Sequence, residues 1–451
     1  MLVLIRLIPK GDLNELCASI ESEKRNLYWE DIKPLYIIRQ EGKDYLSVVL
    51  DIKKLDSIQK VFLKNLTTMT SVKDTKTIPI MSPIYFPLPE GHAQDLQRYQ
   101  VYLRVEPEKY DDVYNSIKKI DYPNDIIVTY AAYSFGDDDI ILSMLAKDRE
   151  TALNFANNKL GSISGVMALD TSQVIKSAYL LPPDKSLEHK NRFLYSSPAG
   201  VEGQLVNPAA YDAYLKENAP MTVIVRLYAK SSLEKLWDDI ESNLPKFESE
   251  DLKPLYASQQ EAKDYITVIF EANNFEILKE VLTTNLPTLV DVRKTRTIPM
   301  LEPTYFLLPK EHPKDLQRYL ITLRVNPSMI QNVRSTIIGT KFPDNLFLTY
   351  LTFSLGDDDV LLSVLADSRN TVQTFVKNLF GNMGGVESYD ISNQLKTKRL
   401  TSMEAWKEHQ NKFLSSHDKE FKENLDDSYD WTNDFYEHAA ITGAFVHEFD
   451  D

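Results

Sequence analysis

Two short acidic turns have residue types and a spacing that could bind a ligand: FGDDD at 135–139 and LGDDD at 355–359. A glycine precedes three carboxylates in each, namely Gly136, Asp137, Asp138 and Asp139, and Gly356, Asp357, Asp358 and Asp359. Backbone N–H groups and carboxylates at such a turn could hold the amino group of an amino acid, or a cation. The alternative is a plain hairpin turn, because Gly and Asp supply positive φ and local hydrogen bonds. The alternating ligands of an EF-hand loop are absent, so we predict no metal site.

Arginine recurs in four apolar segments, as Arg6, Arg104, Arg226 and Arg324. A buried arginine needs an anionic partner, and the carboxylate of a ligand could be that partner. The alternative is an ion pair with the protein's own Asp or Glu. We group Arg104 and Arg324 with the acidic turns as candidate ligand-binding residues.

Four histidines form two pairs, His92 with His312 and His189 with His409. They are weak candidates for an axial haem ligand, and surface or capping roles are the alternative. The sequence has no recognisable nucleophile turn and no phosphate-binding glycine loop, so no catalytic residue is predicted. Cys17 stands at an apolar position of a helical pattern, which indicates a buried structural thiol.

All these paired positions follow from a tandem duplication at a constant offset of 220 residues. DIKPLY at 31–36 returns as DLKPLY at 251–256, and EHKNRFL at 188–194 returns as EHQNKFL at 408–414. Between 75–107 and 295–327, 19 of 33 positions are identical. Residues 1–199 and 221–419 are therefore two copies of one unit, and any site should occur twice.

Each copy divides again into two modules with the order βαββαβ. In the first module apolar runs at 1–8, 33–52 and 71–80 alternate with helical patterns at 11–22 and 53–66. This order is typical of the ferredoxin-like fold. We predict modules at 1–82, 97–181, 221–302 and 317–400, with a linker at 182–220 and an acidic aromatic tail at 401–451.

The strands are too apolar on both faces to remain in water, as in IIVTYAAYSF at 126–135. Packing of two module sheets against each other would cover them. The predicted fold class is α+β, with four ferredoxin-like modules paired as two intramolecular dimeric α/β barrels, and self-association through sheet faces or edges is expected.

The net charge of −15 and the dispersed Lys and Arg argue against a nucleic-acid partner. No apolar stretch is long enough to span a bilayer, and no signal peptide is evident, so we expect a cytoplasmic protein without a membrane partner. The tail from 417 combines acidic residues with aromatics, which favours docking on the chain itself or on a protein partner.

The modules resemble the ligand-binding (RAM) domain of the Lrp/AsnC family, within the dimeric α/β-barrel superfamily. The resemblance rests on FGDDDIILSML at 135–145 followed by SISGVMALDTSQVIK at 162–176, and on LGDDDVLLSVL at 355–365 with NMGGVESYDIS at 382–392. It departs from that family because the sequence opens on a strand, where the family has a helix-turn-helix domain.

The resemblance implies a non-enzymatic, regulatory sensor or adaptor that binds a small molecule, an amino acid being one candidate. The alternative is a haem-binding protein or enzyme of the chlorite dismutase kind. A pure scaffold is a third hypothesis. No cofactor is required by the first hypothesis, and haem is required by one form of the second.

Overall fold

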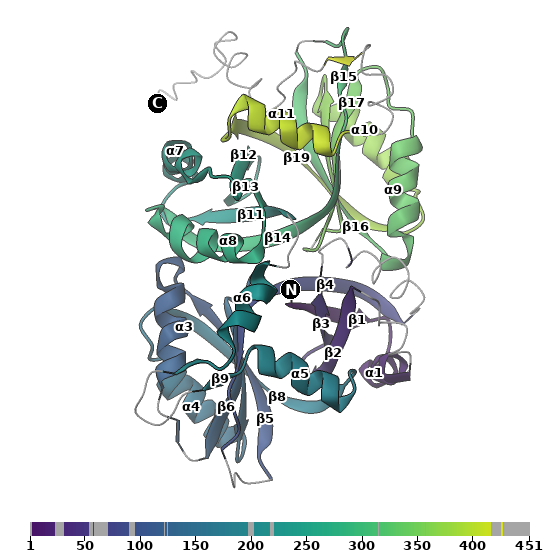
Figure 1. The fold of residues 1–451 in the computed structure, drawn as a ribbon. Helices are drawn as coiled ribbons and strands as arrows, with labels where there is room; N and C mark the ends of the chain where they lie inside the picture. Colours follow the sequence, from purple (N-terminus) through teal and green to yellow (C-terminus); the bar gives the residue numbers. More distant parts are fainter. Residues whose placement is uncertain are drawn as a thin grey trace, which may run out of the picture. The chain divides into compact units, whose positions relative to one another are not determined.

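The computed structural model describes residues 2–22, 31–53, 57, 71–89, 95–120, 122–123, 125–196, 203–216, 221–313, 315–356, 358–415 and 425–426. These residues form a mixed α/β protein with two closed barrels of strands, one in each half of the chain (Figure 1). Each barrel is treated separately below.

The first barrel contains eight strands, and each of its two modules contributes four. The first module supplies β1 (Leu2–Pro9), β2 (Ile32–Gln40), β3 (Leu46–Ile52) and β4 (Val72–Tyr85), with α1 (Leu13–Ser22) after β1. The second supplies β5 (Gln97–Val105), α3 (Tyr110–Lys119), β6 (Ile126–Ser134), β7 (Ile140–Ala146), α4 (Arg149–Phe155) and β8 (Val166–Tyr179). The expected helix at 53–66 lies almost entirely outside the described residues.

The strand order around this barrel is β1-β3-β2-β8-β5-β7-β6-β4. We expected the two sheets to pack face to face as a sandwich. Instead their edges also pair, because β2 is antiparallel to β8 and β4 is antiparallel to β6. The long strand β4 makes this closure possible, since it pairs with β1 as far as Ile80 and with β6 from Ile80 to Tyr85. The pairing with β6 continues across a bulge between Met81 and Ile84, where Ser82 has φ 47°.

The second barrel repeats the first, in the order β11-β13-β12-β19-β16-β18-β17-β14. Its first module contains β11 (Met221–Ala229), α7 (Leu233–Asn243), β12 (Leu252–Gln260), β13 (Tyr265–Ala272), α8 (Phe275–Glu280) and β14 (Val292–Tyr305). Its second contains β16 (Gln317–Val325), α9 (Ile330–Gly339), β17 (Leu346–Ser354), β18 (Val360–Ala366), α10 (Arg369–Phe380) and β19 (Val386–Arg399).

Helices cover the outside of each barrel, and Figure 1 shows α1 and α3 outside the strands of the first one. Helix α1 buries Leu16, Cys17 and Ile20, so the prediction of a buried Cys17 is confirmed. All nine residues of β6 and all seven of β18 are buried. Their continuous apolar runs reflect burial on both faces, as expected of strands covered inside and outside.

A glycine begins the last strand of each barrel for a backbone reason. Gly165 has φ +99° and Gly385 has φ +94°. A Cβ would lie 2.4 Å from Cβ of Lys109 at the first position and 2.3 Å from Cβ of Met329 at the second. Only glycine accepts both the positive φ and this close approach.

The segment predicted as a linker, 182–220, is not irregular throughout. It contains α5 (Pro183–Arg192), the short paired strands β9 (Tyr195–Ser196) and β10 (Gln204–Leu205), and α6 (Pro208–Lys216). The second half repeats the first helix as α11 (Met403–Lys412). Of the tail predicted at 401–451, the structure describes residues 401–415, which include α11, and β20 (Leu425–Asp426), which is antiparallel to β15 (Leu308–Pro309).

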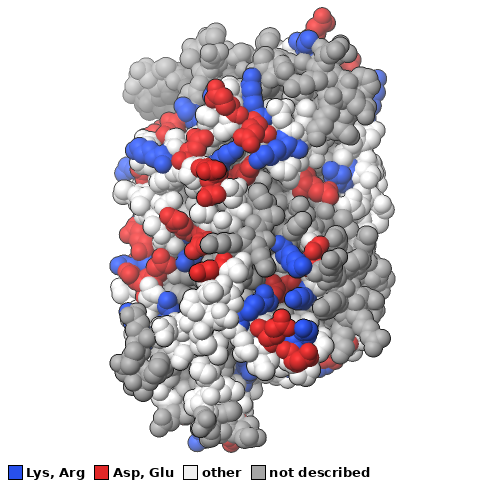
Figure 2. Space-filling view, viewed as in Figure 1, with Lys and Arg blue, Asp and Glu red and all other residues white. Residues whose placement is uncertain are grey.

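The surface in Figure 2 carries basic and acidic side chains interspersed among the residues it describes. Within the ranges given above, no helix combines the length and the apolar character needed to cross a membrane.

Candidate functional site

The acidic turn between β6 and β7 pairs with three cations: Arg6 and Lys76 of the first module, and Arg296 of β14, whose Nη2 lies 3.5 Å from Oδ1 of Asp137. The guanidinium of Arg6, on β1, donates from Nη2 to Oδ2 of Asp138 at 3.2 Å. The ammonium of Lys76, on β4, pairs with Asp137. Arg6 is only 8% exposed, so its ion pair is screened less than a surface pair would be. The alternative interpretation of this arginine, a pairing with the protein's own carboxylate, is therefore confirmed.

Two tyrosine rings flank the Arg6 guanidinium. Its Cζ lies 4.8 Å from the ring centroid of Tyr45 and 5.3 Å from that of Tyr102, distances at which a cation is attracted to the π face. The Tyr102 hydroxyl accepts a hydrogen bond from Nε2 of Gln40 at 2.7 Å. Nε of Arg6 has no hydrogen-bond partner among the described residues. The guanidinium is thus fixed in place and retains a spare donor.

Asp139, the last residue of the turn, has a different role. Its Oδ2 accepts the N–H of Val105 at 2.7 Å, and its Oδ1 accepts the hydroxyl of Tyr110 at 2.9 Å. Burial raises the pKa of Asp139 to about 7, and these two hydrogen bonds oppose the rise only in part. Asp139 therefore fastens the end of β5 to the turn and changes its charge near neutral pH.

We expect the stability of the first barrel to fall as the pH rises from about 4 to 7 and to level off above 7. A carboxyl with a pKa of about 7 in the folded state and 3.8 in the unfolded state binds its proton more tightly when folded. The stability that this proton contributes is complete below pH 4 and is lost progressively as the pH rises to 7, by at most about 4 kcal/mol. Asp139→Asn should flatten this dependence. Thermal unfolding of both proteins from pH 5 to 8 tests it, and parallel profiles would contradict it.

The second barrel repeats the buried ion pair. Arg226 donates to Oδ2 of Asp358 at 3.3 Å, and its Cζ lies 4.9 Å from the ring centroid of Tyr265. Oδ2 of Asp359 accepts the N–H of Val325 at 2.6 Å. Nε of Arg226 also has no hydrogen-bond partner within the described ranges. The predicted residue Asp357 lies outside the described residues.

Three predicted site residues have other positions than expected. Arg104 and Arg324 are exposed on β5 and β16, and the arginines that meet the acidic turns are Arg6 and Arg226 instead. Gly136 packs on Ile78, where a Cβ would lie 3.1 Å from Cγ1 of that residue. Gly136 therefore permits a close approach within the barrel wall.

A second polar cluster lies at the other end of each barrel, which we call the base. In the first barrel the base is the end where Leu2, at the start of β1, pairs with Asp51 of β3. In the second barrel Nδ1 of His409, on α11, bonds Glu271, and its Nε2 bonds the hydroxyl of Tyr305 at 3.1 Å. Lys412 donates to the other oxygen of Glu271 at 2.8 Å. Burial would raise the pKa of Glu271, but the hydrogen bonds and charges of His409 and Lys412 lower it to about 2.

The first barrel has the corresponding cluster with other residues. Nη2 of Arg192 lies 2.8 Å from Oδ2 of Asp51 and 3.0 Å from Nδ1 of His189. Nδ1 of His189 is 3.3 Å from the same Asp51 oxygen. His189 and His409, both weak haem-ligand candidates from the sequence, are 4% and 0% exposed and belong to these clusters.

The other two histidines give no better haem site. His92 lies outside the described residues, and Nδ1 of His312 is 2.9 Å from the carbonyl oxygen of Pro309. Among the described residues, no group of three or more His, Cys, Asp or Glu side chains could hold a metal ion.

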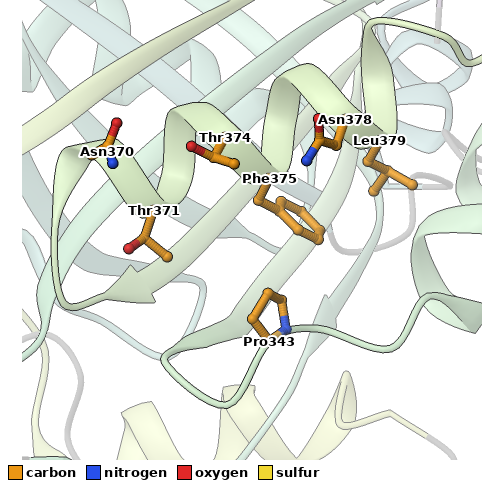
Figure 3. A pocket seen from close by; sticks show the side chains of 7 residues that line it. All are labelled: Pro343, Asn370, Thr371, Thr374, Phe375, Asn378 and Leu379. Carbon is orange, nitrogen blue, oxygen red and sulfur yellow. The ribbon is translucent and has the colours of Figure 1, made fainter.

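A surface groove lies along α10 in the second barrel, and its seven lining residues are labelled in Figure 3. Phe375 forms the apolar floor and stacks on Phe342, with ring centroids 4.9 Å apart. The rest of the lining is Pro343, Asn370, Thr371, Thr374, Asn378 and Leu379. None of these side chains titrates near neutral pH, so the lining contains no general acid or base.

Neither a family model nor a curated protein matches the sequence. Several solved structures are similar at low identity. An anthrone oxidase-like protein is 11% identical, with 40% of this chain and 93% of that one covered and a TM-score of 0.28. The siroheme decarboxylase NirDL is 5% identical, with 43% and 78% covered and a TM-score of 0.29.

A chlorite dismutase mutant from Candidatus Nitrospira defluvii is 11% identical, with 42% of this chain and 94% of that one covered and a TM-score of 0.27. Chlorite dismutase is the kind of protein named above in the alternative hypothesis, a haem-binding protein or enzyme. All three TM-scores lie far below 0.5, so the similarities carry no argument about this chain's activity.

Sequence reasoning missed Tyr45, Tyr102 and the base clusters. The repeated tripeptide KDY at 43–45 and 263–265 already marked Tyr45 and Tyr265 as shared positions. Asp51 has no such signal, because its partner His189 is 138 residues away and the second half has Glu271 in its place.

Proposed function

We propose that the protein is a non-enzymatic sensor or adaptor that binds a small anionic molecule, such as an amino acid, at Arg6 of the first barrel and at Arg226 of the second. The observation that carries the proposal is a buried guanidinium, held between aromatic rings and a turn carboxylate, whose Nε has no partner within the described residues. A ligand carboxylate is the natural acceptor for that donor.

Asp137, Asp138 and Lys76 suit the other end of such a ligand. The Asp137 side chain is 43% exposed and pairs with Lys76, which is 20% exposed. An incoming α-ammonium can take the Asp137 carboxylate, while the α-carboxylate meets Arg6. The tyrosines and the Asp138 contact hold the guanidinium in its bound position before the ligand arrives, which reduces the entropy cost of binding.

Two expectations from the sequence fit this proposal. One is the resemblance to the Lrp/AsnC ligand-binding domain. The other is the pairing of modules as dimeric α/β barrels, in which one chain would supply both modules of each pair. Because each barrel carries its own arginine and turn, the proposal requires two ligands per chain.

The haem alternative does not fit the described histidines. Both ring nitrogens of His409 are engaged, and His312 is tied to a backbone carbonyl. Nε2 of His189 has no hydrogen-bond partner within the described residues, and the imidazole packs against Tyr85 and Phe193, whose ring centroids are 6.1 and 5.1 Å from it.

Titration calorimetry with the twenty amino acids and a panel of small carboxylates tests the proposal. We expect one of them to bind at two sites per chain, and the double variant Arg6→Gln, Arg226→Gln to weaken binding at least about tenfold, because a charged hydrogen bond is lost. The matched control is Arg104→Gln, Arg324→Gln, which removes the same charge from exposed positions of the second modules.

Loss of binding in the control as well would indicate a general electrostatic effect and count against the arginine site. No binding of any compound to the wild-type protein at millimolar concentration would overturn the proposal. Thermal unfolding of each variant shows whether the barrels remain folded.

A further inference from the structure

The bases of the two barrels have the same main-chain frame. After α5 the N–H of Tyr85 bonds the carbonyl of Phe193 at 2.9 Å, and after α11 the N–H of Tyr305 bonds the carbonyl of Phe413 at 2.9 Å. Parallel bridges join Tyr85 to Leu194 and Tyr305 to Leu414. Side chains at the two bases can therefore be compared position by position, at the offset of 220.

An indole fills the base of the second barrel. Trp406, on α11, is 1% exposed. Its ring centroid lies 5.7 Å from Tyr305, 5.9 Å from Tyr256 and 6.0 Å from His409. The contacts with the two tyrosines are edge to face, which is a favourable arrangement of aromatic rings. Trp406 thus packs between these tyrosines and the histidine.

The first barrel has Ser186 at the same position of α5, and the side chains around it are more accessible. Tyr85 is 8% exposed where Tyr305 is 0%, and His189 is 4% exposed where His409 is 0%. Tyr179 approaches Tyr36 with ring centroids 6.5 Å apart, but Tyr179 remains 55% exposed. Tyr179 therefore does not replace the buried indole.

The hydrogen bonds of the two histidines differ in the same way. Nε2 of His409 bonds the Tyr305 hydroxyl at 3.1 Å. Nε2 of His189 is buried and has no hydrogen-bond partner within the described residues. Two groups face Nδ1 of His189, the Asp51 carboxylate at 3.3 Å and the Arg192 guanidinium at 3.0 Å. We assign the shorter contact as the hydrogen bond; because an arginine only donates, Nδ1 then accepts and the ring proton is on Nε2. A buried donor without an acceptor is unfavourable, and an acceptor atom of a ligand would relieve this cost.

We propose that the base of the first barrel binds a planar aromatic molecule with a hydrogen-bond acceptor, whose ring takes the place of the Trp406 indole beside Tyr36 and Tyr85 and whose acceptor meets Nε2 of His189. The second barrel has no such site because Trp406 already fills it. This site is separate from the Arg6 site. Asp51, which pairs with Arg192 beside His189, lies across from Leu2 of β1, and Arg6 is four residues further along that strand.

Titration with quinoline, a bicyclic ring with an acceptor nitrogen, tests the proposal on the full chain. We expect one quinoline per chain and loss of binding in Ser186→Trp, whose indole occupies the space. Ser186→Leu fills part of that space and should weaken binding at least about tenfold. Ser186→Ala, the matched control, removes only a hydroxyl and should bind as the wild type does.

Indole tests the role of His189, because it has the same shape and an N–H in place of the acceptor. It should bind at least about tenfold more weakly than quinoline, since it leaves the Nε2 proton unpaired. Quinoline binding that survives in Ser186→Trp, a stoichiometry of two, or no binding to the wild type would overturn the proposal. Equal affinities for indole and quinoline would overturn the contact with His189.

Discussion

Trp406→Ala should lower the free energy of unfolding of the second barrel by about 3–5 kcal/mol, the range for removal of a large buried aromatic side chain. The indole is 1% exposed and packs against Tyr305, Tyr256 and His409. Its removal leaves a cavity and frees Tyr305 from the position in which it bonds His409. Urea unfolding followed by tryptophan fluorescence measures the loss, because Trp237, 1% exposed on α7 of the same barrel, remains as a reporter in the variant.

Ser186→Ala is the control, at the same helical position of the first barrel. Because Ser186 is partly exposed and fills no core, the change should stay within about 0.5 kcal/mol. A loss below about 1 kcal/mol in Trp406→Ala would mean that the indole does not close the base. That result would also remove the reason to expect a space at Ser186.

The sequence predicts the modules of this fold well, because each module is specified locally. Apolar runs with turns between them predicted β1, β5, β11 and β16, and the helical spacing of Leu16 and Ile20 predicted α1. The duplication doubled every observation. The pattern did not predict which strand edges pair, because the apolar sequence of β4 is compatible with a free edge as well as with the pairing to β6.

The partners of the charged residues were also beyond the sequence. Four arginines occupy similar places in their strands, yet Arg6 and Arg226 are buried and Arg104 and Arg324 are exposed. The difference arises because the turn between β6 and β7 reaches back over β1, a contact 132 residues apart. A single sequence carries no record of that contact.

The helices at the base, α5 and α11, also have contacts that the sequence could not predict. The repeated segments EHKNRFL and EHQNKFL lie at the ends of α5 and α11, and their histidines, His189 and His409, are two of the haem-ligand candidates of the sequence. In the structure each histidine is a packing residue that joins the helix to β3 or β13. The residue three positions earlier, Ser186 or Trp406, distinguishes the two barrels. The sequence does not predict the importance of this position, because it depends on the aromatic rings that the fold places around it.

Glu271→Ala should destabilise the second barrel by about 3–5 kcal/mol, because it breaks a buried charge pair and leaves its cations without an acceptor. The Glu271 side chain is 7% exposed, bonds Nδ1 of His409 and accepts Lys412 at 2.8 Å. The matched control is Glu261→Ala in the same barrel. Glu261 pairs with Arg369 at 2.7 Å, but it is 41% exposed, so its loss should be under about 1 kcal/mol. Urea unfolding at pH 7 distinguishes the two variants.

The acid side of the profile gives the same prediction an independent test. Glu271 has a pKa of about 2 in the folded barrel and an ordinary value of 4.5. The stability that its charge contributes is therefore complete above pH 4.5 and is lost as the pH falls toward 2, by up to about 3 kcal/mol. Glu271→Gln keeps an acceptor but has no charge to lose, so the gap between it and the wild type should close as the pH falls. A gap that stays constant from pH 6 to pH 3 would mean that the carboxylate is not held by its charge, and the cluster would then act through packing of His409 alone.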